Sequence, residues 1–166
     1  MKRKLILLVI AILTAVTPMT GFAAGKRFLA EVADLPGTKY TNVDADILRR
    51  ADNTMTFSNI SGLGIGLDKV KSFEVIECDN TESIARLEDF AKKLVKKNKL
   101  EVITANETED SRDTVYGIIP ADGSKLPYKS HLLVETITKD SYTLIYIAGT
   151  IDWAMMDDYF KNKNKK

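Results

Sequence analysis

The chain has 166 residues and one cysteine, Cys78, so no intramolecular disulfide can form and stability must come from an apolar core. Its 24 basic and 23 acidic residues give a formal net charge of +1. Without residues 1–23, the charge becomes 21 basic against 23 acidic, or −2. This balance argues against a basic surface that coats nucleic acid, and the length suits a single domain.

The first 23 residues have the layout of a signal peptide. Three basic residues at positions 2–4 precede a short apolar run from Leu5 to Val16. This run of about 12 residues is too short to cross a bilayer stably as a helix. Small residues at Gly21 and Ala23 predict cleavage before Ala24 or one residue later. We therefore expect an exported protein, periplasmic or secreted, with no lipid anchor because no cysteine lies near the cleavage site.

The next segments predict short elements joined by loops. Phe28, Leu29, Val32 and Leu35 recur at helical spacing before Pro36-Gly37, which predicts a short helix over 26–34. A strand is expected over 40–43. An acid-capped helix is expected over 44–52, and a glycine-containing loop over 53–68.

The central segment predicts a strand followed by the clearest helix of the chain. Residues 69–78 are rich in Val, Phe and Ile and predict a strand. Asp79 and Glu82 resemble a capping box at a helix start. The predicted helix has one apolar face, consisting of Ile84, Leu87, Ala91, Leu94 and Val95. Its opposite face is rich in lysine, which indicates a solvated surface rather than a dedicated anion site.

Four further strands are predicted, over 99–105, 112–119, 128–138 and 142–149. Short polar links between them favour antiparallel pairing. Helical spacing after Asp152 predicts a closing helix to residue 160, and residues 161–166 read as a basic disordered tail. The expected fold is therefore α+β: a single domain over 24–160 with a mainly antiparallel sheet and helices packed on one face.

The order of these segments resembles a protein family. The opening stretch over 28–48, the strand over 67–76 and the corner over 145–152 are similar to domain-of-unknown-function family 4252 of exported Bacteroidetes proteins. The resemblance covers nearly the whole chain after the signal peptide, and it lies in the spacing of apolar residues and turns. It implies export and an α+β fold. It transfers no catalytic residue, because the family has no established activity.

Candidate reactive side chains are few. His131 is the only histidine, so a metal site would have to be built from carboxylates and one cysteine, and we expect no metal or cofactor. Strand parity places His131 with Leu133 and Glu135, which predicts a solvated histidine. Ser130 and Cys78 lack any motif that would position a nucleophile. We expect Cys78 to be a buried apolar side chain.

Two acidic groups could in principle supply paired carboxylates. One is Asp44 with Asp46, and the other is the set Glu107, Glu109, Asp110 and Asp113. An acidic hairpin loop is the favoured interpretation of the second group. The glycines at 62, 64 and 66 lack the ending of a phosphate-binding loop and precede a strand rather than following one.

The sequence predicts no catalytic residue, and the function it favours is a non-catalytic exported envelope protein that binds a protein partner or a small ligand. One alternative is a carboxylate-based hydrolase with two acidic groups in a pocket. The other is a membrane-surface module that makes weak contact with anionic lipid through the basic tail and an apolar patch.

Overall fold

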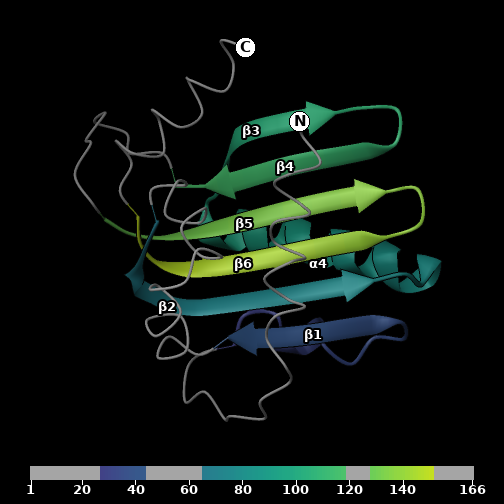
Figure 1. The fold of residues 1–166 in the computed structure, drawn as a ribbon, viewed down its shortest axis with the longest axis horizontal. Coiled ribbons are helices and arrows are strands. Elements are labelled where there is room, and N and C mark those ends of the chain that lie inside the picture. The colour runs from purple at the N-terminus through teal and green to yellow at the C-terminus, as the bar shows by residue number, and fades with distance from the viewer. Residues whose placement is uncertain (1–26, 44–64, 119–127, 152–166) are drawn as a thin grey trace.

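The structure is a computed structural model, and it describes residues 27–43, 65–118 and 128–151 (Figure 1). Several predicted elements lie outside these residues: the signal peptide over 1–23, the helix over 44–52, most of the loop over 53–68, the closing helix over 152–160 and the tail over 161–166.

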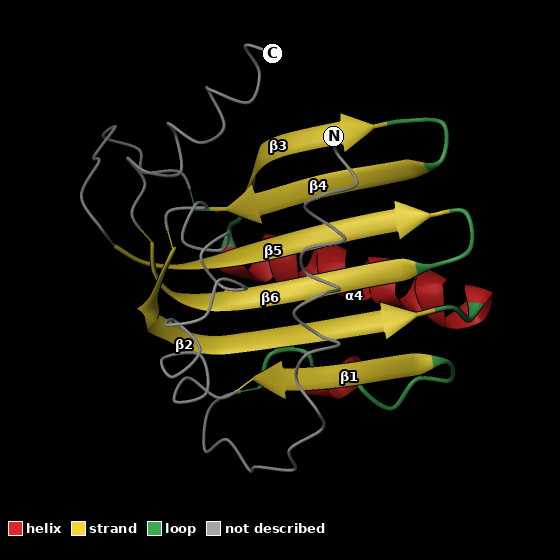
Figure 2. Cartoon of the chain, in the orientation of Figure 1, coloured by secondary structure: helices red, strands yellow, loops and turns green. Residues whose placement is uncertain are grey.

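Six antiparallel strands of the described residues form one sheet, in the order β1-β2-β6-β5-β4-β3 (Figure 2). The predicted mainly antiparallel sheet is thus confirmed. The strands are β1 Thr38–Val43, β2 Ile65–Cys78, β3 Glu101–Glu107, β4 Ser111–Gly117, β5 Tyr128–Thr138 and β6 Tyr142–Ile151.

Helix α4, Thr81–Asn98, crosses behind the sheet and carries the chain from β2 to the far edge at β3 (Figure 1). It is the one α-helix among the described residues. Of the helices that we expected on one face of the sheet, these residues contain only α4. Its N-cap is Asn80, whose side chain accepts a hydrogen bond from the Ser83 amide at 3.0 Å. The predicted capping box at Asp79 is therefore wrong by one residue, because Asn80 makes the capping bond.

Residues 27–35, called the strap below, depart from the predicted helix over 26–34. They contain only one 3-10 turn, Ala30–Val32. The backbone bonds of this turn join residues three apart, Val32 N to Leu29 O at 3.1 Å and Ala33 N to Ala30 O at 3.3 Å, and the Phe28 and Leu29 amides instead donate to the side chain of Glu74 on β2. The strap then turns into β1 at Gly37, whose φ of +69° favours glycine.

The strap and α4 cover the same face of the sheet. Leu29 and Val32 of the strap join apolar side chains of α4 and of the sheet in one buried cluster. Burial of each large apolar side chain stabilises the fold by about 1.5–3 kcal/mol. The sheet contributes Ile76, Cys78, Leu133, Tyr142, Leu144, Tyr146 and Ala148 to this cluster, and α4 contributes Leu87, Phe90, Ala91 and Leu94.

The opposite face of the sheet is also buried and apolar where β2 meets β6. Phe73 on β2 pairs with Ile147 on β6, and Val75 pairs with Ile145, with all four side chains at most 4% exposed. Because both faces are buried, β6 reads as a nearly continuous apolar run and β2 lacks a regular alternation.

Several strand boundaries differ from the prediction: β1 begins at residue 38, β3 spans 101–107, β4 spans 111–117 and β6 ends at 151. Strand β2 begins at Ile65, so the last four residues of the predicted loop over 53–68 belong to a strand. Strand β3 begins at Glu101 rather than residue 99, because Lys99 ends α4 in the left-handed conformation with φ 53°.

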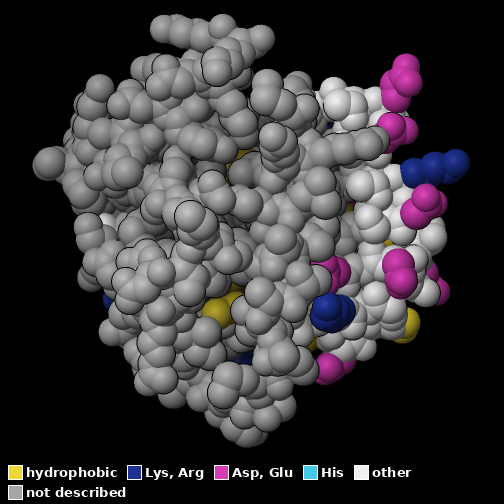
Figure 3. Space-filling view, viewed as in Figure 1, with side chains coloured by type: hydrophobic (Ala, Val, Ile, Leu, Met, Phe, Trp, Pro, Cys, Tyr) yellow, Lys and Arg dark blue, Asp and Glu magenta, His cyan; other side chains and the backbone are white. Residues whose placement is uncertain are grey.

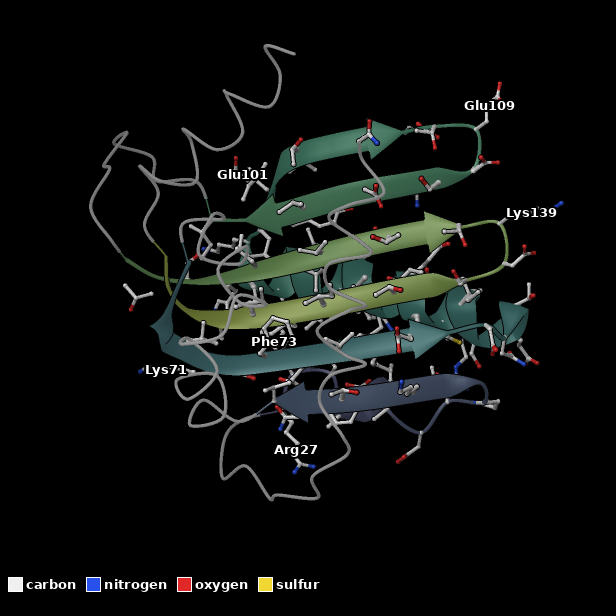
Figure 4. All side chains as sticks on the ribbon, viewed as in Figure 1. Arg27, Lys71, Phe73, Glu101, Glu109 and Lys139 are labelled. Carbon is white, nitrogen blue, oxygen red and sulfur yellow. The ribbon has the colours of Figure 1, made fainter. Side chains whose placement is uncertain are left out.

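The two hairpin turns at one end of the sheet are alike. Thr108 and Ser111 bracket the β3–β4 turn, and Thr138 and Ser141 bracket the β5–β6 turn. In both turns the threonine amide donates to the serine carbonyl, at 2.8 and 2.9 Å, and the serine amide donates to the threonine Oγ1. Glu109 and Lys139 lie at the tips (Figure 4). These side-chain bonds fix both reversals.

Candidate functional site

The candidate site surrounds a buried carboxyl group in the middle of the sheet. Glu74 lies on β2 between Asn42 of β1 and Tyr146 of β6, and its side chain is 0% exposed. Strand parity puts it on the same face as Ile76, the face covered by α4 and the strap. A carboxyl group removed from water requires hydrogen-bond donors, so the local structure must supply them.

Four donors surround Glu74. Its Oε1 accepts hydrogen bonds from the Phe28 amide at 2.8 Å and from the Ser72 hydroxyl at 2.9 Å. Its Oε2 accepts from the Leu29 amide and from the Tyr40 hydroxyl, both at 2.9 Å. One side chain therefore ties together the strap, β1 and β2.

An aromatic contact extends this arrangement onto β6 and β5. The ring of Phe28 stacks on Tyr146, with centroids 4.4 Å apart, and meets His131 edge-on at 5.6 Å. The hydroxyl of Tyr146 lies 2.8 Å from Nδ1 of His131. We call the side chains that receive the strap the socket: Tyr40, Ser72, Glu74, His131 and Tyr146.

His131 differs from the sequence-based expectation. It shares a face with Leu133 and Glu135, as predicted, but this face is the covered one, so the ring is half-buried rather than solvated. Parity identifies residues that share a face without saying which face is buried. Ser130 points to the other side of the sheet and cannot pair with His131. Its buried Oγ has no hydrogen-bond partner in the described part of the chain.

A second buried carboxyl group lies on β5. Glu135 is 6% exposed, and its Oε1 accepts a hydrogen bond from the Tyr142 hydroxyl at 2.8 Å. Its Oε2 accepts a longer bond from Tyr116, at 3.3 Å. Glu135 thus accepts from two tyrosine hydroxyls on neighbouring strands, whereas Glu74 accepts from one, that of Tyr40.

The tyrosines at both carboxyl groups remain neutral donors. Burial, and then the charge of nearby Glu74, raises the pKa of both Tyr40 and Tyr146 well above the usual 10.0. Burial followed by the charge of Glu135 likewise raises the pKa of Tyr142 and Tyr116. A neutral phenol can donate its proton in a hydrogen bond, as Tyr40 does to Glu74 and as Tyr116 and Tyr142 do to Glu135.

The two buried carboxyl groups are far apart. Glu74 pairs with Tyr146 and Glu135 pairs with Leu144, so β6 lies between them with a two-residue offset. Their Cα atoms lie two strands apart across the sheet and two residues apart along it, which corresponds to a separation of about 12 Å. The glycosidase mechanism needs two carboxyl groups that both face one sugar. Leu144 and Tyr146, both 0% exposed, stand between these two side chains.

The remaining sequence candidates are distributed elsewhere. Cys78 is buried, as predicted, with Sγ 3.7 Å from the Asn80 carbonyl oxygen. Asp44 and Asp46 lie outside the described residues. In the acidic hairpin Glu107, Glu109 and Asp110 are exposed, whereas Asp113 is half-buried and its Oδ1 is buried without a hydrogen-bond partner among the described residues. Figure 3 displays acidic side chains along this end of the molecule.

The outer face of α4 is charged, as predicted. In its last two turns it carries only basic ionisable side chains, and Lys92 pairs with Asp89 at 3.4 Å. These exposed lysines, called the lysine row below, are Lys92, Lys93, Lys96 and Lys97.

Sequence reasoning missed Glu74 and the strap that it holds. One signal was available: Glu74 lies within the run Phe73 to Ile76, where an acidic residue interrupts an otherwise apolar strand. A charged side chain in such a strand is seldom fully buried unless it has partners. The partners themselves, the amides of Phe28 and Leu29, lie about 45 residues away and leave no trace in a local pattern.

Comparison with known proteins identifies no relative. No family model, no curated protein and no solved structure matches the chain. Within residues 27–43, 65–118 and 128–151, no three His, Cys, Asp or Glu side chains gather as they would around a metal ion. None of the helices there has the length and apolar character needed to span a membrane.

Proposed function

We propose that this chain is a non-catalytic exported envelope protein that binds a protein partner or a small ligand. The proposal includes removal of residues 1–23, a periplasmic or secreted location and kinship with domain-of-unknown-function family 4252. It also includes a fuller α+β architecture in which the helices expected over 44–52 and 152–160 join α4 on one face of the sheet.

The observation that carries the proposal is the use of Glu74. Four hydrogen-bond donors of the chain itself, two of them backbone amides of the strap, occupy this side chain. A carboxyl group held by fixed donors and sealed from solvent supports the architecture, whereas a general acid or base must reach a substrate. Glu135 is held by tyrosine hydroxyls in the same way.

The test separates a structural role of the carboxyl groups from a catalytic one. Mature protein purified from the periplasm would be assayed against ester, glycoside and phosphoester substrates, together with the variants Glu74→Gln and Glu135→Gln. We expect no turnover by any of the three, and lower melting temperatures for both variants. Turnover by the native chain that disappears in Glu135→Gln, with an unchanged melting temperature, would contradict the proposal and favour the hydrolase.

A second candidate function, contact with an anionic membrane surface, is favoured by the lysine row. Each basic side chain near an anionic bilayer contributes about 1 kcal/mol, so four would give weak, salt-sensitive binding. Co-sedimentation with vesicles of phosphatidylcholine and phosphatidylglycerol tests it. We expect binding that is lost at high salt and in the double variant Lys93→Glu/Lys97→Glu, but retained in Lys39→Glu. Equal binding to purely phosphatidylcholine vesicles would rule out this candidate.

A further inference from the structure

The socket recognises a short peptide segment by three separate features. Glu74 accepts two consecutive backbone N–H groups, those of Phe28 and Leu29. Tyr146 and His131 receive an aromatic ring. The apolar cluster beneath α4 then takes the side chains of Leu29 and Val32, which are 0% and 7% exposed.

None of these contacts depends on the strap being covalently attached nearby. The hydrogen bonds to Glu74 span 45 and 46 residues of sequence, and the stacking on Tyr146 spans more. The same segment supplied by another molecule would offer the same two amides, ring and apolar side chains. The one peptide whose fit is seen in this structure is residues 27–35, and every copy of the chain carries it.

The connection between the strap and β1 is suited to opening. It runs through Pro36 and Gly37, both exposed. The backbone bonds that hold it are Thr38 N to Leu35 O at 3.1 Å and Asp79 N to Gly37 O at 3.4 Å. Gly37 can adopt extended as well as left-handed conformations at little cost. Opening the turn would release few bonds, whereas every socket contact could form again in a partner.

We propose that the socket also binds the strap of a second copy of this chain, so that two copies exchange residues 27–35 about the Pro36-Gly37 turn. The product is a symmetric dimer in which each socket holds its partner's Phe28 and Leu29. Because a short tether gives the chain's own strap a millimolar effective concentration, the closed monomer dominates in dilute solution. The dimer forms when the protein refolds at high concentration.

The test uses two full-length mature variants with complementary defects. Phe28→Ala has a defective strap and an intact socket. Glu74→Gln has an intact strap and a defective socket. When they are refolded together, the strap of the second can enter the socket of the first. We expect a mixed dimer by light scattering and native mass spectrometry, in which the socket of Phe28→Ala holds the intact strap of Glu74→Gln. If neither variant folds alone, we expect the two variants to fold when they are mixed, and this result supports the proposal equally.

In the matched control, Phe28→Ala is refolded with the double variant Phe28→Ala/Glu74→Gln. Neither protein then supplies an intact strap, so no mixed dimer should form. Native protein refolded over a range of concentrations provides a second measurement and should form a dimer at the highest ones. Two results would overturn the proposal: native protein that stays monomeric throughout, or a synthetic peptide of residues 27–35 that binds Phe28→Ala while the two variants fail to pair.

Discussion

The hydroxyl of Tyr142 lies 2.8 Å from Oε1 of Glu135, with both groups buried and on neighbouring strands. Tyr116 donates to the other oxygen of the same carboxyl group at 3.3 Å and is half-buried. The difference in length and burial predicts unequal energies. Tyr142→Phe should lower the free energy of unfolding by about 1.5–3 kcal/mol, and Tyr116→Phe by less than about 1 kcal/mol. Urea denaturation of the two variants checks this order, and equal losses would contradict it.

Replacement of Glu74 by glutamine should weaken the fold while preserving its shape. The hydroxyls of Ser72 and Tyr40 can rotate, but the backbone amides of Phe28 and Leu29 cannot, so the new NH₂ group must face a fixed donor. We expect a loss of about 2–4 kcal/mol in the free energy of unfolding.

The control for this substitution is Glu77→Gln on the same strand. Glu77 forms a surface ion pair with Lys39 at 3.5 Å. Its loss should cost less than about 1 kcal/mol. Similar midpoints of urea denaturation for Glu74→Gln and Glu77→Gln would mean that the buried carboxyl group does not hold the strap as described.

The buried tyrosines predict a fall in stability at alkaline pH. Tyr142 and Tyr146 are both 0% exposed, and their pKa values are raised above 10.0, the value expected in the unfolded chain. Below pH 10 both states keep these protons and stability is fully present. Above it the unfolded state loses protons that the folded state retains, so the free energy of unfolding falls by about 1.4 kcal/mol per pH unit for each tyrosine.

Urea denaturation at a series of pH values above 10 measures this slope. The variant Tyr142→Phe should have a shallower slope, because it contains one fewer tyrosine that resists ionisation. A free energy of unfolding that stays constant as the pH rises above 10 would contradict the burial of these hydroxyls.

The start of α4 offers a comparison between two adjacent residues. The Asn80 side chain caps the helix by accepting from the Ser83 amide, and Asp79 does not make this bond. Asn80→Ala should cost about 1 kcal/mol of stability. Asp79→Ala removes only a charge near the helix N-terminus and should cost no more than about 0.5 kcal/mol. Thermal unfolding followed by circular dichroism measures the two losses of stability. A larger loss for Asp79→Ala than for Asn80→Ala would mean that Asp79 caps the helix.

Local patterns predicted those parts of the fold that local physics determines. Strand β5 has both ends where the sequence put them, at 128 and 138, because β-branched and aromatic residues end at clear turn signals. The apolar face of α4 follows from helical spacing alone: Leu87, Ala91 and Leu94 are buried.

Contacts between distant residues account for what the sequence did not reveal. Phe28 to Leu35 have helical spacing, yet they form one 3-10 turn, and the amides of Phe28 and Leu29 bind Glu74. The attachment of the strap to the sheet therefore depends on a side chain about 45 residues away. The environment of His131 depends likewise on which face of β5 is covered, and alternation within one strand cannot determine that.

The account depends most on the attachment of the strap by Glu74, and hydrogen exchange of two backbone amides tests it directly. Amide exchange measured by NMR should show Phe28 and Leu29 protected in the native protein. In Glu74→Gln these two amides should exchange much faster, while amides in the middle of β5 and β6 keep their protection. Rapid exchange of the Phe28 and Leu29 amides in the native protein would contradict the account.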